Sequence, residues 1–454
     1  MALESINPSS GELIESFTEW VTDHTSQTIE KSTNAFKEWR ATSFEYRAEL
    51  MLQAGKVLSA ERETYAKTMA LEMGKPVADG RAEIDKCVWV CEYYAGHAGN
   101  FLKPEAAESD GSAAYTAFHP LGPVLAVMPW NYPFWQVFRF AAPALMAGNT
   151  GLLKHSSNVQ RCALQIEELF QKAGFPEDVF RTLVIGSGQV NHVIENRHVM
   201  AVTLTGSEAA GRSVAAKAGA CLKKTVMELG GSDAFIVLAD ADVELATTMA
   251  VRARCQNSGQ SCIAGKRFIV AESIYNEFLV KFVKKMEQLN VGDPQDSSTQ
   301  VGPQARGDLR AQLHELVVQS KNMGATIATG GEIPSGDGFF YPPTVVSEVD
   351  PTMPVFTEET FGPVAAIIRA RDEEEAVALA NRSDFGLGGS VWTENISKGE
   401  TIANRLEVGC AFINGIVKSD PRLPFGGVKS SGYGRELSKY GIREFVNIQT
   451  VWIG

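Results

Sequence analysis

The segment from about residue 121 to residue 240 alternates short β-branched runs with stretches of helical periodicity. Runs such as 122–130 and 200–207 end in small or turn-forming residues, and helical patterns follow at 158–173 and 208–219. A strand followed by a helix, repeated, builds a doubly wound parallel sheet through right-handed crossovers. The sequence therefore predicts an α/β fold whose ligands bind at the carboxyl ends of the strands.

A second alternating series begins near residue 242 and continues to residues 409–416. The chain has 454 residues, more than a single hydrophobic core usually serves. We therefore expect two doubly wound α/β domains.

The balance of charge excludes some classes of partner. The chain has 42 Lys and Arg residues against 54 Asp and Glu residues, and its formal net charge of −12 repels nucleic acids and anionic membranes. No window reaches the roughly 18 apolar residues that a spanning helix needs, and the first residues lack the pattern of a secretory leader. We expect no nucleic-acid partner and no membrane partner.

The cysteines indicate the compartment. Seven cysteines, an odd number without CxxC spacing, are typical of free thiols in a reducing environment, so we expect a cytoplasmic protein. Seven scattered histidines do not form a metal-ligand cluster, and no metal site is predicted.

One thiol lies in an unusual neighbourhood. Cys262 is flanked by glycine and small polar residues in the segment 256–265, "QNSGQSCIAG", whereas a cysteine that fills space usually has bulky apolar neighbours. Such a segment leaves room for a substrate beside a nucleophilic thiolate. Taken alone, a buried inert thiol would remain the simpler interpretation.

Two further polar residues fit the same chemistry. Glu228 precedes the double glycine 230–231, where a carboxylate would be free to swing as a general base, although a surface turn is the alternative. Asn131 follows an apolar strand among aromatic residues. Its amide could hold a developing oxyanion, or it could be a structural turn residue.

Six segments in order carry a resemblance to a known family. They are "NTGLLKHSS", "LTGSEAAGR", "MELGGSDAFIV", "NSGQSCIAGKRF", "EETFGPV" and "LPFGGVKSSGYGREL". In order and spacing they resemble the aldehyde dehydrogenase superfamily over nearly the whole chain. The short length and the segment "EMGKP" are most similar to the succinate-semialdehyde dehydrogenases.

The resemblance implies an NAD(P)-dependent oxidation of an aldehyde, with succinic semialdehyde as the favoured substrate. Cys262 matches the nucleophile that attacks the aldehyde carbon to give a thiohemiacetal. Asn131, with the Cys262 backbone N–H, matches the oxyanion donors. Hydride then passes to the nicotinamide, and Glu228 matches the base that activates water to hydrolyse the thioester.

The resemblance also implies a dinucleotide site. Gly206 and Ser207 match a phosphate-binding loop at a helix N-terminus, although their GxxxxG spacing alone would not identify one. Lys154 matches a lysine near the adenosine ribose. NAD-preferring members often have Glu where Ser157 stands, so we expect NADP as the preferred cofactor, with NAD possible.

The nicotinamide end of this site involves three residues. Glu359 matches the acid that holds the nicotinamide ribose, Phe361 lies beside the ring, and Trp130 is assigned to the same site.

Arg139 is a candidate substrate-binding residue, because its charged side chain lies on a mostly apolar segment. It is either paired structurally or aimed into the entrance tunnel, where it could grip a carboxylate with two hydrogen bonds. Family members that act on semialdehyde acids have Arg at this position, and Ser419 matches a residue that contacts the same carboxylate. Gln256 stands where some relatives have a second Arg, so Lys418 or Arg422 could serve instead.

Within the resemblance, the domain boundaries and the oligomer are expectations. The division is a Rossmann-like cofactor domain of residues 1–101 and 120–229, a catalytic domain of residues 230–430, and a β oligomerisation extension of residues 102–119 and 431–454. An edge strand in the extension would invite a second subunit, giving a homodimer or tetramer.

Three alternatives remain open besides oxidation of a small aldehyde that has no carboxylate. A CoA-acylating relative would release the thioester to CoA, and the presence of Glu228 favours water instead. A cysteine esterase would not need Lys154 or Glu359. A non-catalytic scaffold homologue would be expected to have lost Cys262 or Glu228, and both are present.

Overall fold

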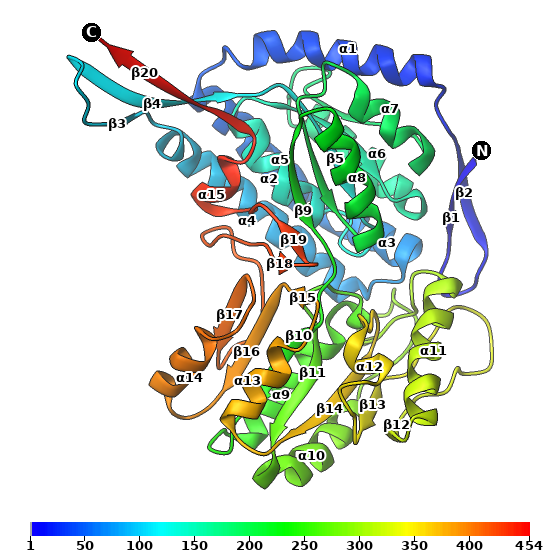
Figure 1. Ribbon diagram of the computed structural model, residues 1–454. Helices are drawn as coiled ribbons and strands as arrows, with labels where there is room; N and C mark the ends of the chain where they lie inside the picture. Colours follow the sequence, from blue (N-terminus) through cyan, green and yellow to red (C-terminus); the bar gives the residue numbers. More distant parts are fainter. Residues whose placement is uncertain (1) are drawn as a thin grey trace.

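Two open sheets of mainly parallel strands dominate the computed structural model, which describes residues 2–454 (Figure 1). The first sheet has six strands in the order β19-β9-β8-β5-β6-β7. Their bounds are β5 (Pro123–Met128), β6 (Thr150–His155), β7 (Phe180–Thr182), β8 (Ala201–Thr205), β9 (Lys224–Glu228) and β19 (Gly432–Tyr433). All are parallel except β19, which pairs antiparallel with β9.

Helices enclose this first sheet. They are α1 (Thr22–Trp39), α2 (Phe44–Ala60), α3 (Arg62–Met73), α4 (Val77–Phe101), α5 (Trp135–Met146), α6 (Gln160–Lys172), α7 (Val190–Glu195) and α8 (Glu208–Ala220), with short 3-10 turns η1 (Ser157–Val159) and η2 (Ser187–Gln189). Every residue of α5 is buried, because this helix is apolar on all sides and packs against both α4 and the sheet. A β-hairpin of β1 (Ala2–Ile6) and β2 (Leu13–Thr18) lies at the N-terminal end.

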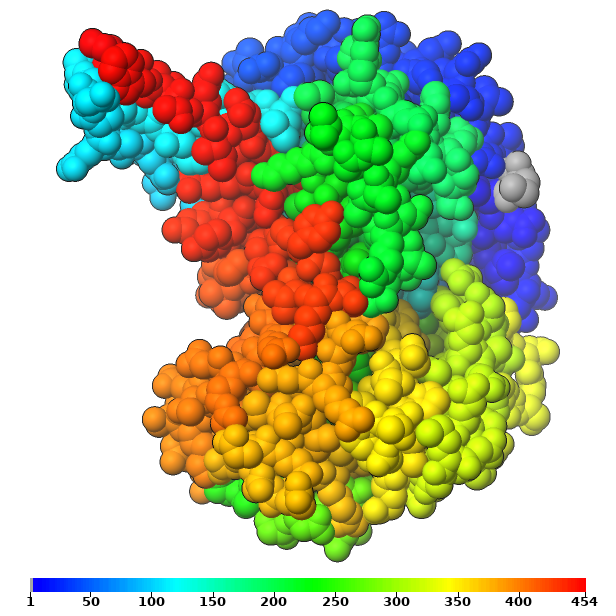
Figure 2. All heavy atoms as spheres, viewed as in Figure 1, coloured from blue at the N-terminus to red at the C-terminus, as the bar shows by residue number. Residues whose placement is uncertain are grey.

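The second sheet lies below the first in Figure 1 and has seven strands in the order β12-β13-β14-β11-β10-β16-β17. Its strands are β10 (Asp233–Val237), β11 (Gly265–Ala271), β12 (Thr326–Thr329), β13 (Thr344–Ser347), β14 (Val364–Ala370), β16 (Gly388–Trp392) and β17 (Cys410–Ile413). Its helical elements are α9 (Val243–Cys255), η3 (Gln256–Gly259), η4 (Glu272–Ile274), α10 (Tyr275–Glu287), α11 (Gly307–Asn322), α12 (Pro354–Thr357), α13 (Glu373–Asn381) and α14 (Ile396–Ala403). Figure 2 shows one face of the molecule hollowed between the parts that hold the two sheets.

A third, smaller sheet projects from the body as an arm (Figure 1). It consists of β3 (Glu105–Ala106), β4 (Ala113–Pro120) and β20 (Val446–Ile453). Strand β20 pairs antiparallel with β4 along its whole length, from Val446 opposite Pro120 to Ile453 opposite Ala113. The short helix α15 (Ser438–Ile442) precedes β20, and β15 (Phe385–Gly386) pairs with β18 (Val428–Lys429) near the second sheet.

The predicted α/β class with two parallel-stranded sheets is confirmed. The residue boundaries of the domains stay a prediction. Strand β19 joins the first sheet, although it falls within the segment 431–454 that we assigned to the extension. None of the helices in residues 2–454 is long and apolar enough to cross a membrane.

Candidate active site

The carboxyl ends of four adjacent strands, β9, β8, β5 and β6, lie along one edge of the first sheet. Glu228 is the last residue of β9, and Lys154 is the second-to-last residue of β6. Gly206 follows β8, and Asn131 lies in the loop that follows β5. Such an edge is where open α/β sheets bind ligands. The fold therefore collects four of the predicted site residues, which are far apart in the sequence, along one side of the sheet.

The segment before Cys262 has an unusual backbone. Asn257, Ser258 and Gly259 have φ angles of 54°, 55° and 74°, in the left-handed region that costs energy for residues other than glycine. The surroundings hold this conformation, since the Asp79 carboxylate accepts a hydrogen bond of 2.8 Å from the Asn257 backbone N–H. The sharp turn ends α9 and presents Cys262 to the neighbouring cavity.

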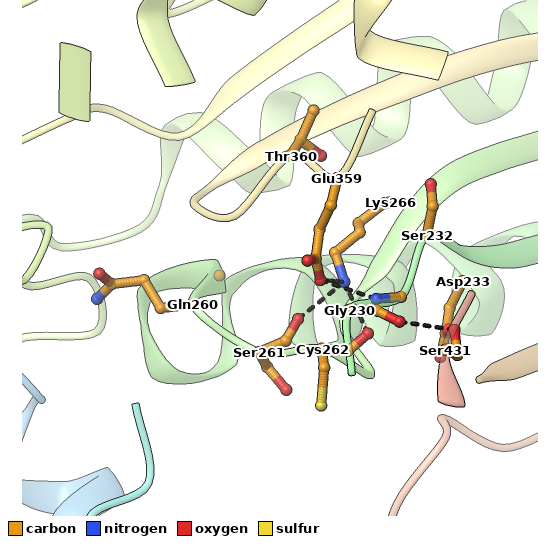
Figure 3. A network of polar contacts seen from close by, with 12 residues as sticks. Gly230, Ser232, Asp233, Gln260, Ser261, Cys262, Lys266, Glu359, Thr360 and Ser431 are labelled. Atoms are coloured by element: carbon orange, nitrogen blue, oxygen red, sulfur yellow. Dashed lines mark hydrogen bonds and ion pairs between the residues drawn. The ribbon is translucent and has the colours of Figure 1, made fainter. Parts of the chain in front are cut away.

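Cys262 lines a cavity of about 610 Å³ whose wall also includes Arg139, Ser419 and Lys86. Figure 3 shows its sulfur pointing away from Lys266, which lies behind the backbone of the cysteine. Burial raises the pKa of Cys262 to about 12, although Lys266 and Arg139 oppose this shift. The thiol therefore holds its proton at neutral pH, and its activation requires a base.

Asn131 lies directly against the cysteine loop. Its Nδ2 donates to the Gln260 carbonyl at 3.1 Å, and its own backbone carbonyl accepts from Asn257 Nδ2 at 2.8 Å. An amide nitrogen has two N–H groups, so Nδ2 has a second donor for a ligand oxygen. The side chain is buried, which fixes the position of that donor.

Glu228 is a buried carboxyl group at the end of β9. Neither of its oxygens has a hydrogen-bond partner within residues 2–454. The group lies against Gly426, where an added Cβ would be 2.6 Å from Glu228 Oε1, and Gly426 adjoins Phe425 of the cavity wall. Burial, and then the negative charge of Glu436, raise the pKa of Glu228 well above its usual range. A carboxylate whose pKa is raised is a stronger base than an ordinary carboxylate, which suits a group that must accept a proton.

Arg139 is both paired and part of the cavity wall, so the structure combines the two alternatives that the sequence left open. Its guanidinium forms an ion pair with Glu436, donates to Thr205 Oγ1 at 3.2 Å and lies 4.7 Å from the centre of the Phe425 ring. Both charged side chains of the pair are buried. A buried carboxylate therefore already matches the positive charge of Arg139, and its substrate role stays a prediction.

Sequence reasoning missed Lys86, which reaches the same cavity from α4. Its Nζ donates to Ser419 Oγ at 2.7 Å and lies 4.2 Å from the centre of the Trp135 ring. No motif surrounds this lysine. The available signal was the helical spacing of Asp79, Glu83 and Lys86, which places three charges on one face of a mostly apolar helix.

A second lysine that sequence reasoning missed lies behind the cysteine (Figure 3). Lys266 Nζ donates to the backbone carbonyls of Ser261 and Cys262 at 2.9 Å and 2.7 Å, and forms an ion pair of 3.2 Å with Glu359. Glu359 Oε1 also accepts from the Gly231 backbone N–H at 3.0 Å. These contacts tie the cysteine loop to the predicted cofactor residue Glu359.

The double glycine after Glu228 has a packing role in this network. A Cβ on Gly231 would lie 2.5 Å from the Cys262 carbonyl oxygen, and a Cβ on Gly230 would lie 2.6 Å from Glu359 Oε2. Both distances are too short for a side chain. Close approach to the backbone of Cys262 therefore explains Gly231, whereas at Gly230 the nearest atom belongs to the Glu359 side chain; the mobility that the sequence suggested for Glu228 stays a prediction.

The remaining predicted cofactor residues lie near the strand ends. Lys154 is buried, which lowers its pKa, while Ser157 is exposed in η1. Ser207 caps α8 by accepting from the Ala210 backbone N–H at 3.4 Å, so the positive end of the helix dipole faces this edge. A lysine, a hydroxyl group and a helix N-terminus together fit the phosphates of a dinucleotide.

The aromatic residues of the site lie together. Trp130 and Phe361 meet edge to face, with ring centroids 5.7 Å apart.

Lys418 and Arg422 are the residues that could serve in place of the second Arg found in some relatives. Lys418 lines the cavity, whereas Arg422 forms an ion pair with Asp420. Within residues 2–454, no group of three His, Cys, Asp or Glu side chains is arranged to hold a metal ion.

Comparison with known proteins identifies the family. The model of the "Aldehyde dehydrogenase family" matches residues 1–451. The chain belongs to the aldehyde dehydrogenase family. A probable NADP⁺-dependent succinate-semialdehyde dehydrogenase from Synechocystis sp. is 48% identical over 453 residues, which cover 100% of both chains.

Solved aldehyde dehydrogenase structures agree with the fold. The succinic semialdehyde dehydrogenase of Streptococcus pyogenes in complex with NADP⁺ is 37% identical, with a TM-score of 0.97 and 100% of both chains covered. An NAD-dependent aldehyde dehydrogenase of Sinorhizobium meliloti is 31% identical, also with a TM-score of 0.97, and covers 100% of this chain and 91% of its own. The predicted family and enzyme class are confirmed.

Proposed function

We propose that this aldehyde dehydrogenase oxidises succinic semialdehyde to succinate and prefers NADP⁺. The observation that carries the proposal is the cavity at Cys262, because Lys86 and Ser419 on its wall, beside the Arg139–Glu436 pair, place a cation and a hydroxyl group near the nucleophile. These groups suit an aldehyde with a carboxylate at its other end. The Synechocystis relative, at 48% identity, and the S. pyogenes structure support the same substrate and cofactor.

The side chains divide the chemistry among them. Glu228 first takes the thiol proton of Cys262 and passes it to water. Sγ then forms a bond to the aldehyde carbon while the C=O electron pair moves onto the oxygen, where the amide of Asn131 stabilises the charge. A nicotinamide held by the cofactor residues would supply the oxidant by taking the hydride of the aldehyde carbon, which leaves a thioester on Cys262. Glu228 then takes a proton from water, which attacks the thioester on Cys262 and releases the acid.

The cofactor would lie across the strand ends of the first sheet. Lys154 and the small side chain of Ser157 leave space and positive charge for a 2′-phosphate, whereas a carboxylate at position 157 would repel it. The other residues that we assign to the cofactor are Gly206 and Ser207 for the diphosphate, and Trp130, Glu359 and Phe361 for the nicotinamide end.

The test compares kcat/KM with each dinucleotide and each class of aldehyde. We expect NADP⁺ to exceed NAD⁺ by about tenfold or more, and succinic semialdehyde to exceed butanal, a neutral aldehyde with four carbons, by a similar factor. Formation of NADPH and free succinate without CoA would separate this activity from ester hydrolysis and from CoA acylation. A clear preference for NAD⁺ or for butanal would contradict the proposal.

We propose that two copies of the chain associate through the arm, in a homodimer or as part of a tetramer. Strand β20 is the outer strand of its sheet, and Ile448 and Trp452 on it are exposed by 58% and 54%. An exposed strand edge with apolar side chains is suited to a partner strand. Light scattering should give a multiple of the 49.2 kDa chain mass, and a monomer at micromolar concentration would contradict the proposal.

We also propose that the protein is cytoplasmic, because its seven free cysteines fit a reducing compartment.

A further inference from the structure

Lys86 and Ser419 form a cluster of donors on the cavity wall. Ser419 Oγ accepts hydrogen bonds from Lys86 Nζ at 2.7 Å and from Trp135 Nε1 at 3.1 Å. Because a hydroxyl oxygen has two lone pairs, these bonds direct the hydroxyl proton of Ser419 to a different acceptor. The ammonium of Lys86 has three N–H donors and uses one of them on Ser419.

The cluster has several donors and no anion. Within residues 2–454, no carboxylate forms an ion pair or a hydrogen bond with Lys86; Glu83 and Asp420 only oppose, through their charges, the lowering of its pKa by burial. The nearby Glu83 is fully engaged, since it pairs with Lys75 and accepts from the backbone N–H groups of Phe134 and Trp135. The ammonium of Lys86 therefore has an uncharged acceptor in Ser419 and no anionic partner, and a ligand carboxylate could supply that partner through a charge-assisted hydrogen bond.

Arg139, the cation that the sequence pointed to, is in the opposite situation. Its guanidinium is paired with the buried carboxylate of Glu436, so the two side chains together have no net charge. A substrate carboxylate that approached Arg139 would also approach Glu436, which would repel it. Lys86 lies on the same cavity without a carboxylate partner, and the Trp135 ring holds the ammonium in position.

We infer that Lys86, together with the hydroxyl group of Ser419, binds the carboxylate of the acidic aldehyde and determines the preference for it. The inference rests on the proposed function and adds a residue to it. Lys86 sets substrate specificity and takes no part in the bond changes at Cys262.

The test is the ratio of KM values for succinic semialdehyde and butanal, with saturating NADP⁺. Lys86→Met keeps an aliphatic side chain and removes the charge, and should raise the KM for succinic semialdehyde about 10- to 100-fold, while the KM for butanal changes less than about threefold. Lys86→Arg should recover most of the loss, because it restores a cation. Lys103→Met, which removes an exposed lysine just beyond α4, should leave both KM values unchanged.

Three results would overturn the inference. In the first, the wild-type enzyme prefers succinic semialdehyde, and the Lys86→Met variant has the same ratio of KM values for succinic semialdehyde and butanal as the wild type. The second is an equal loss for both aldehydes. The third is a larger effect of Lys418→Met than of Lys86→Met. If Lys86→Met does not fold, as judged by its Tm, Lys86→Gln is measured against the same criteria. A wild-type enzyme without any preference for the acid contradicts the proposed function itself.

Discussion

The two sides of Cys262 differ in how their polar groups are satisfied. Behind the cysteine, Lys266 meets two backbone carbonyls and Glu359, and Glu359 in turn accepts from Gly231. On its other side Cys262 faces the cavity, where Lys86 has no carboxylate partner, and Glu228, buried against Gly426 next to the cavity wall, has no hydrogen-bond partner within residues 2–454. The first arrangement stabilises the fold, whereas the second leaves charges and donors for a substrate.

This difference has an energetic basis. A buried polar group without a partner costs about 1–3 kcal/mol, so folding alone would not favour the side that faces the cavity. At Glu228 the same cost appears as a raised pKa, because burial disfavours the charged form of the carboxyl group. The groups without partners therefore lower the stability of the fold and are available for reaction. Substitutions on the two sides of Cys262 should differ in their effects on stability and activity.

The largest effect should come from Glu228→Gln, on the cavity side. The amide has the same shape but cannot accept a proton, so kcat should fall about 10²- to 10⁴-fold. Because the native carboxyl group is buried without hydrogen-bond partners, Tm should stay the same or rise slightly. Steady-state kinetics and thermal unfolding measure the two quantities.

A matched control is Glu83→Gln, at another buried carboxylate. Glu83 forms an ion pair with Lys75 and accepts two backbone N–H groups, so the same substitution there should lower Tm. If Glu228→Gln lowered Tm as much as Glu83→Gln, Glu228 would be a structural group and the contrast between the two sides would fail.

The next effect concerns the network behind the cysteine. Lys266→Met leaves two carbonyls and the Glu359 carboxylate without their donor. The free energy of unfolding should fall by about 1–3 kcal/mol, and kcat should fall about 10- to 100-fold because the cysteine loop loses its support. Activity and Tm decrease together here, in contrast to Glu228→Gln. A variant with normal Tm and normal activity would show that the network has no positioning role.

The sequence drew attention to Cys262, Glu228 and Asn131 but not to the lysines around the cysteine, for a physical reason. Cys262, Glu228 and Asn131 stand in short segments whose composition is unusual for a core, so their chemistry is visible locally. Lys266 and Lys86 lie in ordinary strand and helix patterns, and their partners, Glu359 and Ser419, are far away in the sequence. Only the fold shows such pairs, and only the fold shows that Glu436 already neutralises Arg139.

The alternation of strands and helices predicted the two sheets, but not their strand order. The antiparallel edge strand β19 has only two residues, too few for a recognisable pattern. The left-handed turn at Asn257 and Ser258 was also hidden, because neither residue type requires it and the contact with Asp79 stabilises it. Local patterns therefore gave the fold class, and long-range contacts determine the remaining details.

A smaller effect should appear in the pH dependence of substrate binding. Burial, and then Arg139 of α5, lower the pKa of Lys86 to about 8, while Cys87 and Glu83 of α4 and Asp420 oppose this shift. The ammonium is therefore charged below about pH 8 and loses its charge above it. The KM for succinic semialdehyde should rise about tenfold per pH unit above this value, whereas the KM for butanal should not.

The ratio of the two KM values isolates Lys86 from other groups that titrate. Ionisation of Cys262 or Glu228 changes the chemistry of both aldehydes equally and cancels in the ratio. Lys86→Arg should abolish the rise, because arginine keeps its charge throughout this range. A ratio that is constant from about pH 7 to about pH 9.5 in the wild-type enzyme would argue against an unpaired lysine as the anchor.

The smallest effect should come from Gln256→Arg at the exposed rim of the cavity. Gln256 lines the cavity and donates to the Tyr132 hydroxyl at 3.2 Å, and it occupies the position of a second arginine in some relatives. An exposed charge contributes about 0.2–1 kcal/mol, so the KM for succinic semialdehyde should fall by at most about fivefold. Gln256→Glu should raise this KM by a similar factor, and the two effects should shrink together in about 1 M salt. The effect of Lys86→Met should persist in the same salt, because Lys86 is half-buried and screened less. Equal salt dependence at both positions would place the carboxylate at the rim and not on the inner wall of the cavity.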